Sequence, residues 1–159
     1  MKGERPKVKR MTRDFSHSAI TTLSFEDTLT LLRELLRVEG FRVVAEIPFH
    51  REFQRHVGLQ WQNYTVLVVW NPFLAYQAVL SDRDAGIFMP FNFVVAENGS
   101  CTLVAATNHL LFGRLAGTIG AQVLARDLNR MIDRILSRVS DVDEPADNVA
   151  PQRQWKEAV

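Results

Sequence analysis

The chain has 159 residues, of which 47% are hydrophobic and 23% are charged, and its formal net charge is +1. This is the length and composition of one globular domain with its own core, and it excludes a mostly disordered chain. The single cysteine, Cys101, excludes an internal disulfide and a zinc site built from several cysteines. No apolar run approaches the roughly 18 residues of a membrane span, so we expect no membrane partner.

Charge is concentrated at the two ends of the chain. Residues 1–14 carry a net charge of +4 and residues 141–159 a net charge of −3, whereas the stretch between them is neutral. We therefore expect a basic flexible arm over 1–17, one domain over 18–139 and an acidic flexible tail over 140–159. A nucleic-acid-binding domain needs a basic field on its folded part, so nucleic acid is not an expected partner. The start of the chain lacks the apolar core of a signal peptide, which favours a cytoplasmic location.

The first helix is predicted to start after Ser24, whose side chain suits an N-cap. Apolar residues then recur at intervals of three and four from Phe25 to Leu36, which gives the helix one apolar face. Gly40 suits the left-handed residue that follows a helix end.

A second, shorter helix is predicted after residue 71. Asn71 is a strong N-cap and Pro72 is a favoured first helical residue. We expect this helix to run to about Leu80 and to place Phe73 and Tyr76 on the same face as Leu80.

Strands alternate with these helices. Alternating apolar residues over 41–49 predict a strand with one buried face, and Pro48 places that strand at an edge or a bend. The β-branched and aromatic run over 64–70 is typical of an interior strand. Asn98-Gly99 between two apolar runs predicts a β-hairpin over 91–107.

Residues 50–58 are polar and ambiguous, and residues 59–62 alternate as a further short strand. After the hairpin, 108–116 is expected to be a connection, and a long amphipathic helix is predicted over 119–139. The resulting order, β-α-β-(β)-β-α-β-β-α, predicts an α+β fold with a mainly antiparallel sheet and helices on one face.

Two stretches resemble the DUF302 family, also described as TT1751-like. The first is the helix that begins Ser24-Phe25-Glu26-Asp27 and ends before Gly40-Phe41. The second is Asn71-Pro72-x-x-Ala75-x-x-Ala78-x-Leu80 followed by Gly86-x-x-x-Pro90 and a hairpin. The resemblance covers about residues 18–139. It implies a small fold related to TBP-like folds that often forms homodimers, and it implies no particular reaction. Some relatives have a Cys after the Pro of the second motif, where this chain has Phe91.

Most of the candidate binding residues lie in or beside the second motif, and Arg55 is added as a further polar contact. Unpaired N–H groups at a helix start favour ligands, and large rings near strands either fill a core or line a cavity. We therefore expect a small, partly apolar ligand between the sheet and the 119–139 helix. The candidate walls and polar contacts are Trp70, Asn71, Pro72, Tyr76, Pro90, Phe91, Asn92, Phe93 and Arg55.

No Gly-x-Ser-x-Gly elbow, His-Glu-x-x-His pair or Walker loop is present, which favours a binding module over an enzyme. If residues 50–56 are extended, His50 and His56 share a side but lie about 20 Å apart, too far for one ion. His17 and His109 are isolated candidates for haem ligands. We expect a homodimeric binding module without a cofactor. Two alternatives stay open: an interaction module without a ligand, and a haem or metal protein that uses His50, His56 or His109.

Overall fold

The structure is a computed structural model that describes residues 11–142. The predicted basic arm up to residue 10 and the acidic tail from residue 143 lie outside the described residues. Residues 11–17, which the charge pattern places in the arm, include strand β1 (Met11–Thr12) and the start of β2 (Ser16–Thr21). The arm prediction therefore extends too far, because these residues pair with each other and with the sheet.

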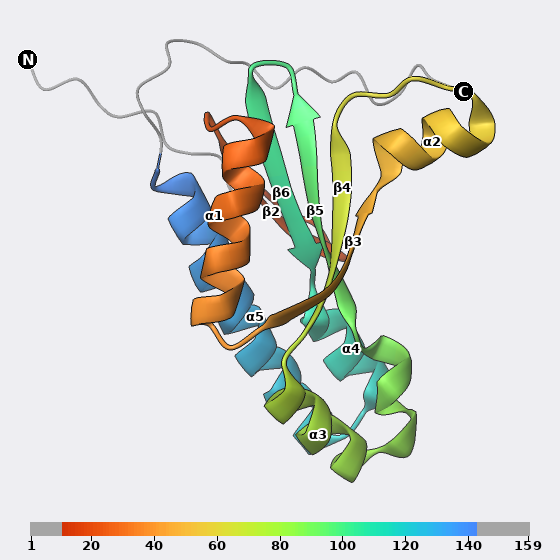
Figure 1. The fold of residues 1–159 in the computed structure, drawn as a ribbon. Helices are drawn as coiled ribbons and strands as arrows, with labels where there is room; N and C mark the ends of the chain where they lie inside the picture. Colours follow the sequence, from red (N-terminus) through yellow and green to blue (C-terminus); the bar gives the residue numbers. More distant parts are fainter. Residues whose placement is uncertain (1–10, 143–159) are drawn as a thin grey trace, which may run out of the picture.

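A six-stranded antiparallel sheet in the order β1-β2-β6-β5-β4-β3 is the centre of the fold (Figure 1). Its other strands are β3 (Arg42–Pro48), β4 (Tyr64–Trp70), β5 (Phe91–Asn98) and β6 (Cys101–Thr107). The β5–β6 hairpin forms as predicted and turns at Gly99, whose φ of 64° is one that glycine adopts without strain. β3 is an edge strand, as Pro48 predicts.

Helices α1 (Phe25–Val38) and α5 (Ile119–Ser140) cover one face of this sheet (Figure 1). The Ser24 Oγ atom accepts the Asp27 N–H at 3.1 Å and caps α1 as expected. Burial of apolar side chains between the helices and the sheet forms the core. Its largest fully buried side chains are Leu32, Leu36, Leu67, Phe93, Leu128, Ile132, Ile135 and Leu136. The predicted α+β architecture is confirmed.

The stretch after β3 is a helix, α2 (Phe49–Val57), and the extra strand predicted over 59–62 does not form. Phe49, Phe53 and Val57 are spaced by four, so the helical period outweighs the alternation that continues from the strand. The prediction that β3 has one buried face is also wrong. Most of its residues are exposed, because the strand lies at the edge and its register shifts between Val43 and Ala45.

At the opposite end of the sheet lie α3 (Pro72–Ser81), the 3₁₀ helix η1 (Arg83–Phe88) and α4 (His109–Ala116), the last where a connection was expected (Figure 1). The predicted apolar face of α3 points outward, with Phe73, Tyr76 and Leu80 at least 64% exposed. Its buried residues are the small Ala75 and Ala78, and the half-buried Leu74 also packs against the core. Among the described residues, no helix is both long and apolar enough to cross a bilayer.

Helices α4 and α5 pack closely against each other at Gly113. A Cβ atom there would lie 2.9 Å from the Ala125 Cβ atom and 3.2 Å from the Gln122 Cα atom. Both distances are shorter than carbon–carbon contact, so a side chain at this position forces the helices apart.

We predict that Gly113→Val lowers the free energy of unfolding by about 1–3 kcal/mol through this overpacking. The control is Gly86→Val, because a Cβ atom at Gly86 has no neighbour within 4 Å. Urea denaturation measures both. Equal stability of the two variants would contradict the close helix contact.

Candidate functional site

The predicted ligand residues Phe91 and Phe93 fill the space between the sheet and α5. Phe93 is fully buried and Phe91 is 5% exposed. The Phe91 ring packs edge-on against Phe41 at 5.6 Å and against His109 at 4.3 Å, measured between ring centroids. These two rings belong to the core.

Several of the other candidates meet where β4 ends and β5 begins. Asn71 caps α3, with its Oδ1 atom accepting the Phe73 and Leu74 N–H groups at 3.1 Å each. Pro72 is the first residue of α3. Trp70 and Asn92 alternate with the buried Val69 and Phe91, so they point to the face of the sheet that α1 and α5 do not cover.

The remaining candidates are separate from this group or peripheral to it. Tyr76 is exposed on α3, and Pro90 precedes β5 after a cis peptide bond. Arg55 lies on α2 at the other end of the sheet, where its Nη1 atom is 3.7 Å from Glu52 Oε1. The structure therefore does not bring all the candidates around one cavity, and their role in ligand binding stays a prediction.

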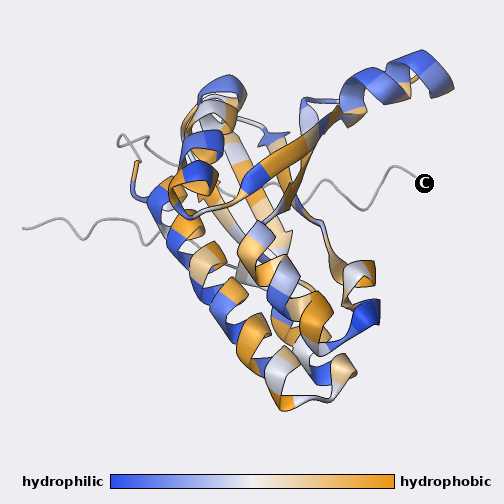
Figure 2. Cartoon of the chain, turned by 60° about the horizontal axis from the view of Figure 1, so that its bottom comes forward, coloured by the Kyte–Doolittle hydropathy of each residue, from blue (hydrophilic) through white to orange (hydrophobic). Residues whose placement is uncertain are grey.

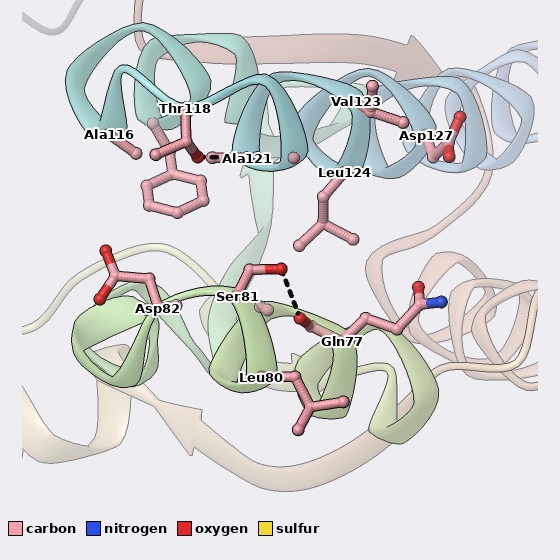
Figure 3. Close-up of a pocket in the computed structure, with 14 residues that line it drawn as sticks. Gln77, Leu80, Ser81, Asp82, Ala116, Thr118, Ala121, Val123, Leu124 and Asp127 are labelled. Atoms are coloured by element: carbon pink, nitrogen blue, oxygen red, sulfur yellow. Dashed lines mark hydrogen bonds between the residues drawn. The ribbon is translucent and has the colours of Figure 1, made fainter.

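A cleft of about 450 Å³ opens instead between α3 and the first half of α5, with α4 and η1 at its base (Figure 3). Its apolar walls are Ala78, Leu80, Ala85, Phe112, Ala116, Ala121, Val123 and Leu124. Its polar and glycine positions are Gln77, Ser81, Asp82, Thr118, Gly120 and Asp127. None of the predicted ligand residues lines it. Because residues 108–116 were expected to be a connection, Phe112 and Ala116 were not predicted to lie on a helix that lines a cleft.

The turn between α4 and α5 sets the mouth of the cleft. Gly117 ends α4 with a φ of 68°, a backbone conformation that residues with a side chain rarely adopt. Thr118 then caps α5, and its Oγ1 atom accepts the Ala121 N–H at 3.2 Å. Gly117 therefore shapes the turn between α4 and α5, and Gly120, inside α5, forms part of the cleft wall.

A family model, the domain of unknown function DUF302, matches residues 17–139. The chain belongs to the DUF302 family. A crystal structure of an uncharacterized conserved DUF302 protein from Bacillus stearothermophilus has the same fold, with a TM-score of 0.74 and 21% sequence identity. The alignment covers 80% of this chain and 99% of that one. No curated protein matches the sequence.

A buried polar network ties α4 of this DUF302 domain to α5 and β2. The Asn129 Oδ1 atom on α5 accepts the His109 backbone N–H at 2.8 Å, and its Nδ2 atom donates to Asn108 Oδ1 at 2.8 Å. The same Nδ2 atom lies 3.2 Å from His17 Nε2 on β2. Asn108 also caps α4, with its Oδ1 atom accepting the Leu110 N–H.

His109 is the most perturbed titratable group in this network. Its Nδ1 atom lies 3.1 Å from the Thr107 carbonyl, and its Nε2 atom has no partner among the described residues. Burial lowers the pKa of His109 from 6.5 to about 4, so the ring is neutral at pH 7.

The histidines of the haem or metal alternative lie far apart. His50 Nδ1 accepts the Tyr64 N–H at 3.1 Å, and His56 Nε2 lies 3.2 Å from Glu52 Oε2. Both histidines are on α2, whereas His109 is on α4 at the opposite end of the sheet (Figure 1). In residues 11–142, no group of three His, Cys, Asp or Glu side chains is placed to hold a metal ion.

We predict that the neutral His109 makes stability fall on acidification. Between pH 6.5 and about 4 His109 is protonated in the unfolded chain but neutral in the folded chain. The free energy of unfolding therefore falls by up to about 3 kcal/mol across this window. Above pH 6.5 the contribution is fully present.

Urea unfolding as a function of pH, on the wild type and on His109→Gln, measures this loss. The variant is expected to have a shallower slope between pH 4 and 6.5, and His56→Gln, on the exposed helix α2, is the control. Identical slopes for wild type and His109→Gln would refute the assignment.

Proposed function

We propose that this DUF302 chain is a non-enzymatic binding module that acts as a homodimer and takes a small, partly apolar ligand. In this proposal the second copy covers the sheet face that α1 and α5 leave open. The observation that carries it is one continuous apolar surface, which runs from that open face onto α2.

The open face carries every second residue of the five longer strands. Side chains such as Val95 and Val104 point into the core, so their neighbours along the strands point to the other side. The residues on that side are mainly small and apolar. They include Ile20, Val66, Val68, Val94, Ala96, Leu103 and Ala105, of which Val66 and Ala96 are buried and the other five are half-buried. Over the described chain no helix covers them, although a sheet normally buries an apolar face against another layer (Figure 1).

A row of aromatic rings continues this face onto α2. Tyr64 lies on the open face and stacks on Phe49 at 5.6 Å between ring centroids. Phe49 contacts Phe53 at 5.7 Å, and Phe53 contacts Trp61 at 6.5 Å. Beyond these rings Val57 is 62% exposed.

Helix α2 itself has no buried residue and projects from the sheet on the side away from α1 and α5 (Figures 1 and 2). Tyr64, Phe49 and Phe53 therefore join two surfaces at an angle, the flat sheet and the projecting helix. The open sheet face of one copy and the apolar side of α2 of another copy are both apolar surfaces, so each can bury the other. A two-fold axis lets α2 of each copy pack on the open face of the other.

The size of the surface supports this reciprocal arrangement. Five strands about 4.8 Å apart and about 20 Å long have a footprint of roughly 500 Å². A stable interface buries about 800 Å² on each partner, so the sheet face alone falls short. The apolar side of α2 supplies the additional area.

The ligand of this proposal belongs in the cleft between α3 and α5. The sequence predicted that the ligand lies between the sheet and the 119–139 helix, but Phe91 and Phe93 fill that space. The cleft is still bounded by α5, and its walls are mostly apolar with a few polar groups, as in small-molecule sites.

We predict that replacing both Val57 and Leu59 with Glu converts the dimer into a monomer. Both side chains are more than 60% exposed and lie in one apolar patch with Phe53 and Trp61, so the change leaves the fold intact while it puts charges on the apolar surface. Sedimentation velocity is expected to show twice the chain mass for the wild type and a dissociation constant at least 100-fold weaker for the double variant.

The matched control is Ile119→Glu, which changes a residue that is 82% exposed on α5 and should leave the dimer unchanged. A wild-type chain that is monomeric, or a double variant that dimerises as tightly as the wild type, would overturn the dimer proposal.

A further inference from the structure

We infer that the cleft between α3 and α5 binds a small molecule with an apolar body and a protonated amine. This inference deepens the proposed function, on which it rests only for the statement that the chain takes a small ligand. The cleft is lined by helices, η1 and their connections, with no residue from the sheet or α2. It is therefore separate from the proposed dimer surface.

The cleft exists because its facing residues are short. Ala78 and Ala85 lie on one side, and Gly120 and Ala121 lie on the other. A Cβ atom at Gly120 would lie 3.7 Å from the Ser81 Oγ atom, an ordinary contact, so the gap at this point has room for about one methyl group and a longer side chain closes it. The volume of about 450 Å³ is within the range of small-molecule sites.

Apolar groups form both the floor and the rim of the cleft. Phe112 and Leu124 are buried at its base, and their side chains face an apolar ligand body. Leu80 and Val123 border the cleft, but their side chains point away from the gap between α3 and α5 and are 69% and 49% exposed (Figure 3).

The charged groups on the cleft are both carboxylates, Asp82 at one end and Asp127 at the other (Figure 3). Among the residues that the structure describes, no Lys or Arg lines the cleft. Asp82 Oδ1 accepts the Asp84 N–H at 2.9 Å, and Asp127 Oδ1 lies 3.1 Å from Arg130 Nη1. The second oxygen of Asp82 is therefore available to a cation, whereas Arg130 already neutralises Asp127 in part.

These charges select the class of ligand. An anionic ligand would meet two carboxylates, and the start of α5 is already capped by Thr118. An ammonium group instead donates to Asp82. The Gln77 side chain, which makes no hydrogen bond to the described residues, lies on the same wall (Figure 3).

The test compares three eight-carbon probes with the purified full chain: octylamine, octanol and octanoate. Isothermal titration measures affinity, and amide chemical shifts locate the site. We expect octylamine to bind at least tenfold more tightly than octanoate, with shifts confined to α3, η1, α4 and the first half of α5. Asp82→Asn should weaken octylamine about tenfold and leave octanol unchanged.

Gly120→Leu should abolish binding of octylamine and octanol, because its side chain fills the cleft. Leucine is a better helix former than glycine, so this variant is expected to fold. Gly86→Leu, at a glycine that does not line the cleft, is the matched control. Octanoate binding as tight as octylamine, absence of binding by all three probes, or unchanged affinity in Gly120→Leu would overturn the inference.

The Val57→Glu, Leu59→Glu double variant separates this result from the dimer proposal. If that variant is monomeric and still binds octylamine, both proposals stand. If the wild type is monomeric but binds octylamine, only the dimer proposal fails. If the wild type is dimeric and binds no probe, only the cleft assignment fails.

Discussion

Helices α1 and α5 pack on the same face of one antiparallel sheet, and the other properties of the molecule follow from this one-sided packing. The covered face buries Leu67, Phe93 and Val104 completely and provides the apolar burial that stabilises the fold. Within residues 11–142, no second helix layer covers the small apolar residues of the opposite face. Because α2 adds its own uncovered rings beside that face, the surface that remains has the character of an interface between two chains.

The same packing creates the cleft at the other end. Gly113 lets α4 approach α5 closely, and Asn129 fixes the start of α4 by accepting the His109 backbone N–H. Helix α3 meets α5 through alanines, so the two helices leave a gap that longer side chains would close. The dimer surface and the cleft therefore arise from separate parts of one scaffold and can be altered independently.

The sequence predicted the fold well where local signals agreed with tertiary packing. Ser24 and Asn71 cap helices as expected, and the hairpin around Gly99 forms. The errors lie where tertiary contacts decide. The period of four in α2 was masked by the strand alternation before it, and the bulky face of α3 points outward because alanines make its contacts. The cleft lies between α3 and the consecutive helices α4 and α5, which are distant from α3 in sequence, so no single motif could indicate it.

The central claim is that a second copy covers the open sheet face, and isotope-filtered NOE spectroscopy tests it most directly. A one-to-one mixture of ¹³C-labelled and unlabelled chain reports only contacts between protomers. The account predicts cross-peaks between protomers from the methyl groups of Val94 and Ala105 to the ring protons of Phe53. Cross-peaks between protomers that arise only from α3 or α5, with the open-face methyl groups silent, would contradict it.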